Sequence, residues 1–253
     1  MTVSWSPRAM RIDAAGLHYR ELNRLIREMA SRSVRRVELH NVFGQRYIGT
    51  NLRGRARIDI YGTPGNDLGA FMDGPTIVVH GNAQDGCGNT MNGGTIIVHG
   101  RAGDITGLAA RGGKIFVRDN VGYRAGIHMK EYNGKHPLLV VGGTSQDFLG
   151  EYMAGGVLVL LGLQLREGEP HPANLVGAGM HGGVIYLRGT IDRERLDNAV
   201  TVSEPGEKET AFLRRVAREF GRHFGRDEED IMLRPFLKLA PLSHRPYGRL
   251  YAH

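Results

Sequence analysis

The chain has 253 residues, including 37 glycines and a single cysteine, and a formal net charge of +7. Glycine is at about twice its usual share while proline is ordinary, which excludes a collagen and a disordered low-complexity chain. Cys87 alone excludes a disulfide framework, and no apolar run could act as a signal peptide or cross a membrane, so we expect a soluble, cytoplasmic protein. The arginines are interleaved with acidic residues over 20–36 and 214–226, which favours solvated helix faces or an acidic partner protein over nucleic acid.

An amphipathic helix is predicted close to the N-terminus. In LHYRELNRLIREMASR the apolar residues recur at helical spacing, which indicates a helix over residues 17–31. The next stretch, VRRVELHNV, is predicted to be a strand that leads into the region that follows.

From residue 47 onward, glycine recurs in a fixed phase. Seven anchor glycines are separated by 20, 19, 19, 19, 24 and 27 residues: Gly49, Gly69, Gly88, Gly107, Gly126, Gly150 and Gly177. Five residues after most anchors comes a second glycine, doubled in several copies: Gly54, Gly74, Gly93, Gly112, Gly155 and Gly182. An apolar triplet follows it, as in Ile96, Ile97 and Val98.

A period of about 19 or 20 residues is too short for a helical repeat and fits one coil of a parallel β-solenoid. Each coil stacks its strand on that of the coil below, about 4.8 Å away, so equal phases become neighbours. Apolar triplets fit parallel strands covered on both faces, and glycine fits the corners because a positive φ carries no Cβ clash there. We therefore predict an all-β fold, a single-stranded parallel β-helix of about seven coils.

Two further phases predict ladders. Three residues after the anchors lie residues that we interpret as a core ladder: Met72, Met91, Met153 and Met180, with Leu52 and Ala110. Three residues before the anchors lie Asp85, Asp104, Asp147 and Asn174, which predict corners where the side chain caps its own backbone. A calcium ladder is the alternative, although one oxygen per corner falls short of the roughly 6–8 ligands that calcium takes.

Two coils carry insertions, GIHMKEYNGKHP at residues 126–137 and QLREGEPHPAN at residues 164–174. Insertions on a solenoid form loops on one face, where binding usually occurs, so we expect partner contacts there. The candidate interface residues are His128, Glu131, His136, Glu169 and His171.

After the repeats, EKETAFLRRVAREFGRHFG predicts a second amphipathic helix, with Phe212, Leu213, Val216 and Phe220 on one face. We expect the two helices to cap both ends of the solenoid and so cover the open strand edges. The predicted organisation is an N-terminal helix and strand cap over 1–46, a β-helix over 47–191 and a C-terminal helical cap over 192–253.

Several other motifs that could indicate a functional site are better explained as structural features of the repeat. GAGMHG at residues 177–182 matches GxGxxG, but an apolar strand follows where a dinucleotide site needs a helix. His80 and His99 share a phase with Arg118, which favours a solvent-facing ladder over a metal site because no carboxylate holds that phase. His128 and His136 with Glu131 are a similar weak metal candidate, and Cys87 between two glycines is interpreted as a packing residue. We find no catalytic constellation.

The GxxxxGG repeat, the inserted GIHMKEYNGKHP, the DFLGEYMAGG and GAGMHGGVIYLRG coils and the terminal SHRPYGRLY together resemble the GXGXG domain of glutamate synthase. The resemblance covers about residues 12–251, and the chain is similar to a stand-alone version of that domain. It implies a right-handed β-helix with no catalytic, cofactor-binding or metal-binding residues of its own. Similar glycine coils occur in one of the subunits of formylmethanofuran dehydrogenase and in scaffold subunits of N-methylglutamate synthase-like enzymes.

The resemblance implies a non-catalytic scaffold subunit of a glutamate synthase-like oxidoreductase complex in glutamate biosynthesis and nitrogen metabolism. The implied partners are a class II glutamine amidotransferase subunit and a synthase subunit that carries FMN and an iron–sulfur cluster. Two other hypotheses stay open: an enzyme with its site around His128, Glu131 and His136, and a structural module that stacks end to end.

Overall fold

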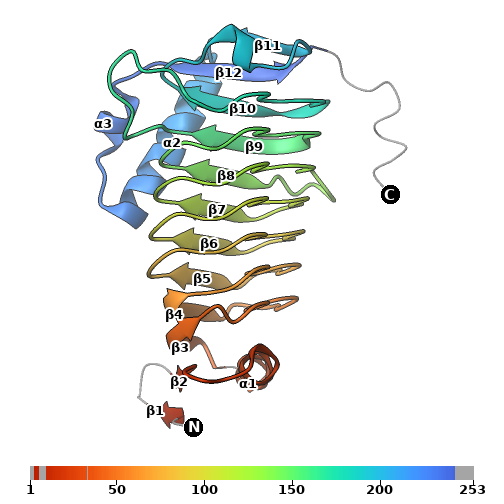
Figure 1. The fold of residues 1–253 in the computed structure, drawn as a ribbon, viewed down its shortest axis with the longest axis vertical. Coiled ribbons are helices and arrows are strands. Elements are labelled where there is room, and N and C mark those ends of the chain that lie inside the picture. Colours follow the sequence, from red (N-terminus) through yellow and green to blue (C-terminus); the bar gives the residue numbers. More distant parts are fainter. Residues whose placement is uncertain (1–2, 6–9, 33, 243–253) are drawn as a thin grey trace.

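The computed structural model describes residues 3–5, 10–32 and 34–242 of the chain. Figure 1 shows a tall stack of coils, each contributing one strand to a single sheet. The C-terminal SHRPYGRLY, which contributes to the resemblance, lies outside the described residues.

Nine strands of the sheet run parallel in chain order. They are β2 (Met10–Asp13), β3 (Arg36–Phe43), β4 (Arg57–Thr63), β5 (Thr76–Val79), β6 (Thr95–Val98), β7 (Lys114–Val117), β8 (Leu138–Val141), β9 (Ala154–Leu160) and β10 (Gly182–Arg188). Equivalent triplet positions pair directly, as Ile77 with Ile96 and Ile96 with Ile115. The predicted β-solenoid is therefore confirmed. Each of the seven strands β4 to β10 follows one anchor glycine, and the six intervals between the anchors make about six turns, slightly fewer than the predicted seven coils.

The anchor glycines occupy the corners as predicted. Gly88 has φ +73°, and a Cβ there would lie 2.3 Å from Cδ1 of Ile115 in the strand of the next coil. Its N–H donates to the carbonyl of Leu68 at 2.8 Å, and Gly107 donates in the same way to Cys87 at 2.7 Å. The corner is thus both left-handed and tightly packed, and each condition alone favours glycine.

The interior of the solenoid is filled by aliphatic side chains. In each triplet the outer two residues point inward, as Ile96 and Val98 do, and the middle residue points to the opposite face, as Ile97 does. The methionine ladder is confirmed, since Met72, Met91, Met153 and Met180 are all buried, and Met129 joins them at the same phase.

The acidic corner ladder bonds differently from the prediction. Oδ1 of Asp85 accepts a hydrogen bond from the backbone N–H of Asp104 at 2.9 Å, and Asp104 accepts in the same way from Tyr123. Oδ1 of Asp147 accepts from the N–H of Asn174 at 2.9 Å. The side chains cap the next coil, because stacking brings that coil's free N–H closer than their own backbone.

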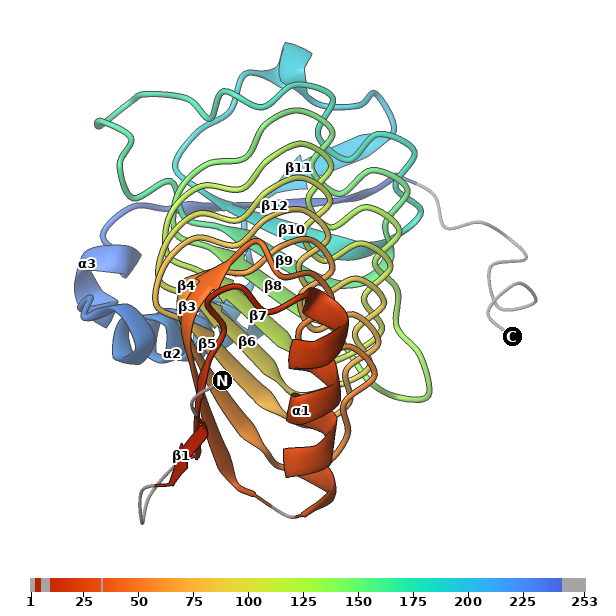
Figure 2. The same ribbon diagram turned by 60° about the horizontal axis from the view of Figure 1, so that its bottom comes forward.

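The two ends of the solenoid are covered in different ways. Helix α1 (Tyr19–Ser31) lies across the N-terminal end, with Leu22, Leu25, Ile26 and Met29 buried against the first coils (Figure 2). Strand β1 (Val3–Trp5) pairs antiparallel with β2. At the other end β12 (Phe236–Pro241) pairs antiparallel with β10, and β11 (Val200–Ser203) with β12. A short 3-10 helix, Arg193–Arg195, precedes β11.

The second predicted helix exists as α2 (Glu207–Phe224), but it does not close the C-terminal end as expected. It lies along the side of the sheet, where Leu213, Val216 and Phe220 form a second core with outward-facing strand residues such as Phe116 and Val140 (Figure 1). Nζ of Lys114 on β7 binds the Glu219 carboxylate of α2 at 2.8 Å. The helix packs there because the apolar middle residues of several strands would otherwise expose a large apolar surface to water. The last coil needs only a strand that pairs with its open edge.

The short α3 (Glu228–Met232) completes this side of the molecule. Nε of the buried Arg188 on β10 donates to the carbonyl of Ile231 at 2.6 Å, and Nη2 donates to that of Asp230 at 3.2 Å. Among the described residues, no helix is both long and apolar enough to cross a bilayer.

Candidate docking surfaces

The first insertion brings two of its three candidate residues together. Nδ1 of His136 lies 2.9 Å from Oε1 of Glu131, and both side chains are exposed. The Glu131 carboxylate also accepts from the N–H of Gly156 at 3.3 Å. The ring of His128 stacks on Tyr152 of the next coil, with centroids 5.4 Å apart. The structure therefore pairs Glu131 with His136 and places His128 in a separate surface stack.

The second insertion separates its two candidates. Glu169 is exposed and accepts from the backbone N–H of Arg166 at 2.8 Å. The prediction that His171 lies at an interface is wrong, because this side chain is fully buried and its Nε2 lies 2.9 Å from the carbonyl of Arg188. Burial lowers the pKa of His171 in spite of that hydrogen bond, so the imidazole is held neutral. The loop is polar in sequence, yet this residue anchors it to the coil.

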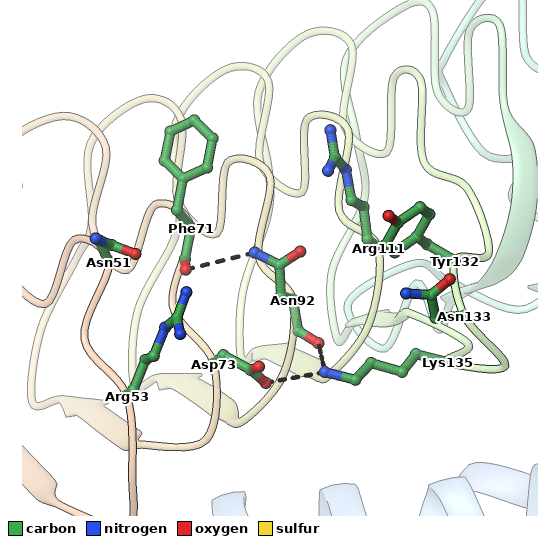
Figure 3. A pocket seen from close by; sticks show the side chains of 9 residues that line it. All are labelled: Asn51, Arg53, Phe71, Asp73, Asn92, Arg111, Tyr132, Asn133 and Lys135. Atoms are coloured by element: carbon green, nitrogen blue, oxygen red, sulfur yellow. Dashed lines mark hydrogen bonds and ion pairs between the residues drawn. The ribbon is translucent and has the colours of Figure 1, made fainter. Parts of the chain in front are cut away.

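A surface cleft with a volume of about 590 Å³ lies along the coil corners beside the first insertion (Figure 3). The corners contribute Asn51, Arg53, Phe71, Asp73, Asn92 and Arg111, and the insertion contributes Tyr132, Asn133 and Lys135. An isolated bridge between Tyr132 and Lys135 closes the tip of the insertion. The cleft is therefore built from several coils and one loop, and it combines three cations with one carboxylate.

Lys135 fixes the insertion over the cleft. Its Nζ lies 3.0 Å from Oδ1 of Asp73 and donates to the carbonyl of Asn92 at 2.9 Å, so the loop reaches back across neighbouring coils. The guanidinium of Arg111 lies 5.5 Å from the ring centroid of Tyr132. The corner residues of this cleft were not predicted from the sequence, although they all lie four residues after an anchor glycine: Arg53, Asp73, Asn92 and Arg111.

A ring stack runs along one edge of the sheet. His40 stacks on Tyr61 at 4.6 Å between centroids, Tyr61 on His80 at 4.5 Å, and His80 on His99 at 5.5 Å. The predicted ladder of His80 and His99 is confirmed and is longer than expected. Within the described ranges, no group of three or more histidines, cysteines and carboxylates is arranged to hold a metal ion.

The carboxylate of Asp59, which lies at a different position of the repeat from the stacked histidines, contacts this ring stack. The buried Asp59 of β4 binds Arg57 at 2.7 Å, Arg36 at 3.0 Å and Nε2 of His80 at 3.2 Å. Burial raises the pKa of Asp59, but the hydrogen bonds from Arg57 and His80 and the charge of Arg36 outweigh burial, and the pKa lies below its usual value. Asp59 therefore stays ionised and organises this charged part of the outer face.

A second groove of about 340 Å³ separates the end of α2 from β5 and β6. Its lining includes Arg57, His99, Glu219, Arg222 and His223. Burial lowers the pKa of His99, and the charges of His80 and Arg118 act in the same direction. Glu219 is already bound by Lys114, as Asp73 of the first cleft is by Lys135, so the carboxylate of each groove is neutralised within the molecule.

Cys87 is fully buried in the solenoid interior, and burial raises its pKa to about 12. We expect the thiol of the folded protein at pH 8 to react with a thiol reagent roughly a thousand-fold more slowly than the thiol of the unfolded chain, because the thiolate is the reactive form. The rate of absorbance change with and without denaturant measures this. Equal rates in the two states would contradict the packing interpretation.

GAGMHG is also explained by the fold. Its Met180 belongs to the core ladder, and its last glycine, Gly182, begins β10. A strand therefore follows the motif, as predicted.

Comparison with known proteins gives three findings. The family model described as GXGXG motif matches residues 23–242. An uncharacterized protein of Methanocaldococcus jannaschii is 48% identical over 248 residues, which is 95% of each chain. The third finding is a chain in the X-ray crystal structure of the formyltransferase/hydrolase complex (FhcABCD) from Methylorubrum extorquens in complex with methylofuran. It superposes with a TM-score of 0.57 at 18% sequence identity, and the match covers 95% of this chain and 94% of that one. At this identity the superposition shows a similar fold.

Proposed function

Because the chain belongs to the GXGXG family, we propose that it is a non-catalytic scaffold subunit of a multi-subunit oxidoreductase complex of the glutamate synthase type, acting in the cytoplasm. Its proposed partners are a class II glutamine amidotransferase and a flavoprotein that carries FMN and an iron–sulfur cluster. The chain would hold these two enzymes at fixed positions.

The observation that carries the proposal is the rigid, filled body of the solenoid. Inward-facing residues of successive coils pack into one continuous aliphatic core, and each corner is tied to the next coil by backbone hydrogen bonds. Such a body keeps a fixed distance between surfaces on different coils. The likeness in fold to a chain of a multi-subunit complex, over 94% of that chain, supports the same function.

A subunit of a complex like formylmethanofuran dehydrogenase or N-methylglutamate synthase is the second candidate. It is favoured by the fold of the chain from the formyltransferase/hydrolase complex, which superposes over 95% of this chain. Both candidates assign the chain a docking function, and they differ in the enzymes that dock.

Purification of the tagged chain from its native host tests the proposal. We expect an amidotransferase and a flavoprotein in the eluate, with the absorption spectrum of FMN and glutamine-dependent activity. Subunits that transfer or hydrolyse formyl groups would support the second candidate. A chain that elutes alone under gentle conditions would contradict both.

The rival hypothesis of an enzyme with its site on the first insertion requires His128, Glu131 and His136 to act together. The triple alanine variant, assayed in the purified complex, separates the two ideas. Unchanged turnover supports the scaffold, and loss of turnover with an intact complex supports the enzyme.

A further inference from the structure

We propose that the cleft formed by Arg53, Phe71, Arg111 and the first insertion binds an extended acidic segment of a partner subunit, with an apolar side chain between two carboxylates. This inference rests on the proposed docking function and assigns it a place and a partner chemistry. The cleft is hereafter called the corner cleft.

The charges of the corner cleft favour an anion. Lys135 is bound to Asp73 at 3.0 Å, so the one carboxylate of the lining is already neutralised. Neither Arg53 nor Arg111 has an ion-pair partner within the part of the chain that the structure describes. Two guanidinium groups therefore remain for carboxylates of a ligand, which they bind better than any other side chain does.

The spacing of the two arginines favours an extended segment. Arg53 and Arg111 share a phase but lie three coils apart, and three coil spacings amount to about 14 Å. An extended chain covers that length in roughly four residues. Figure 3 shows the two arginines toward opposite ends of the lining, on different coils, with Phe71 and Asn92 between them. Two acidic residues separated by three others match this distance.

Phe71 supplies the apolar contact between the arginines. Its side chain remains 49% exposed, and its backbone has φ +58°, a conformation that bulky residues rarely adopt. The next corner below has Asn51 in the same conformation, with φ +55°, so the fold does not require an aromatic residue here. Exposed aromatic residues flanked by arginine are typical of the residues that dominate binding energy at interfaces.

Binding of a synthetic peptide to the isolated chain tests the inference. The probe is a fluorescein-labelled heptapeptide, Ser-Glu-Gly-Leu-Gly-Glu-Ser, measured by fluorescence anisotropy at low salt. We expect saturable binding that weakens as salt is added, because salt screens exposed charges. The same peptide with glutamine in place of glutamate should not bind.

Four variants locate the site. R53Q and R111Q should each weaken binding roughly fivefold to tenfold, since each removes a charge-assisted hydrogen bond. R101Q is the matched control, because Arg101 is exposed outside the cleft, and its affinity should be unchanged. F71N keeps a residue that tolerates positive φ, so the protein folds, and it should weaken binding of the leucine peptide but not of the same peptide with glycine in place of leucine.

Three results would overturn the inference. The first is an equal loss of peptide affinity in R101Q and R111Q. The second is complete displacement of the peptide by inorganic phosphate at millimolar concentration. The third is a single-stranded oligonucleotide of similar length that binds more tightly than the peptide. The outcome is separable from the docking function. A chain that copurifies with partners but fails to bind the peptide refutes the corner cleft alone, and the reverse result refutes the complex alone.

Discussion

Replacing Gly88 with alanine is expected to lower the free energy of unfolding by about 2–5 kcal/mol, the sum of left-handed backbone strain and overpacking. The added Cβ would lie 2.3 Å from Cδ1 of Ile115, and φ is +73° at this corner. Backbone bonds between coils hold the corner on both sides, so the strand of the next coil cannot retreat without breaking its register. Denaturant unfolding followed by circular dichroism measures the change.

Two further variants separate the causes. Gly134 has φ +70° with open space around its missing Cβ, so Gly134→Ala should cost only the backbone part, about 1–2 kcal/mol. Ile115→Val removes the clashing Cδ1, so the double variant G88A/I115V should be more stable than the sum of the two single changes predicts. Strict additivity would show that the coils are not packed as described.

The second large effect is expected at Phe220, which is fully buried between α2 and the outer face of the sheet. Phe220→Ala should lower the free energy of unfolding by about 3–5 kcal/mol, because a buried aromatic ring leaves a cavity. The amides of α2 should lose more protection from hydrogen exchange than those of β5 and β6, because they also exchange when α2 alone separates from the sheet. The interface alone is weakened and the solenoid interior is intact.

Phe43 provides the matched control, since this phenylalanine is 90% exposed and Phe43→Ala should change stability by less than about 0.5 kcal/mol. If Phe220→Ala behaves like Phe43→Ala, α2 does not pack on the side of the sheet. An equal loss of protection in α2 and in all strands would instead show that α2 and the solenoid unfold as one unit.

The stacking of the coils could be predicted because a parallel solenoid converts sequence period into spatial contact. Once Gly69, Gly88 and Gly107 share a phase, the pairing of Ile77 with Ile96 and of Ile96 with Ile115 follows. The contacts of the two insertions were harder to predict, because a loop outside the repeat has no equivalent position in the next coil that would fix its neighbours. Nothing in the sequence places Lys135 on Asp73 or buries His171.

The position of α2 was also missed, although a signal was present. The middle triplet residue is apolar in the later strands, as Ile97 and Phe116 are, but acidic in β3 and β4, where Glu38 and Asp59 occupy the same row. That change of chemistry marks where the outer face passes from solvent and ion pairs to a covered core. An apolar helix face alone does not say which surface it covers, and the row of middle residues does.

The corner cleft also combines a part that could be predicted from the sequence with a part that could not. Its corner arginines lie in one phase and could have been found by aligning the coils. Its far wall depends on how the first insertion folds back, which only the structure shows.

Deleting the chain from its native host tests the scaffold most directly, with the size of the partner complex measured by native mass spectrometry. The partners are those that copurify with the tagged chain. We predict that they separate into smaller species and lose their coupled reaction, while each keeps its own partial reaction. Partners that stay together at a mass reduced only by this chain, with full coupled turnover, would contradict the account.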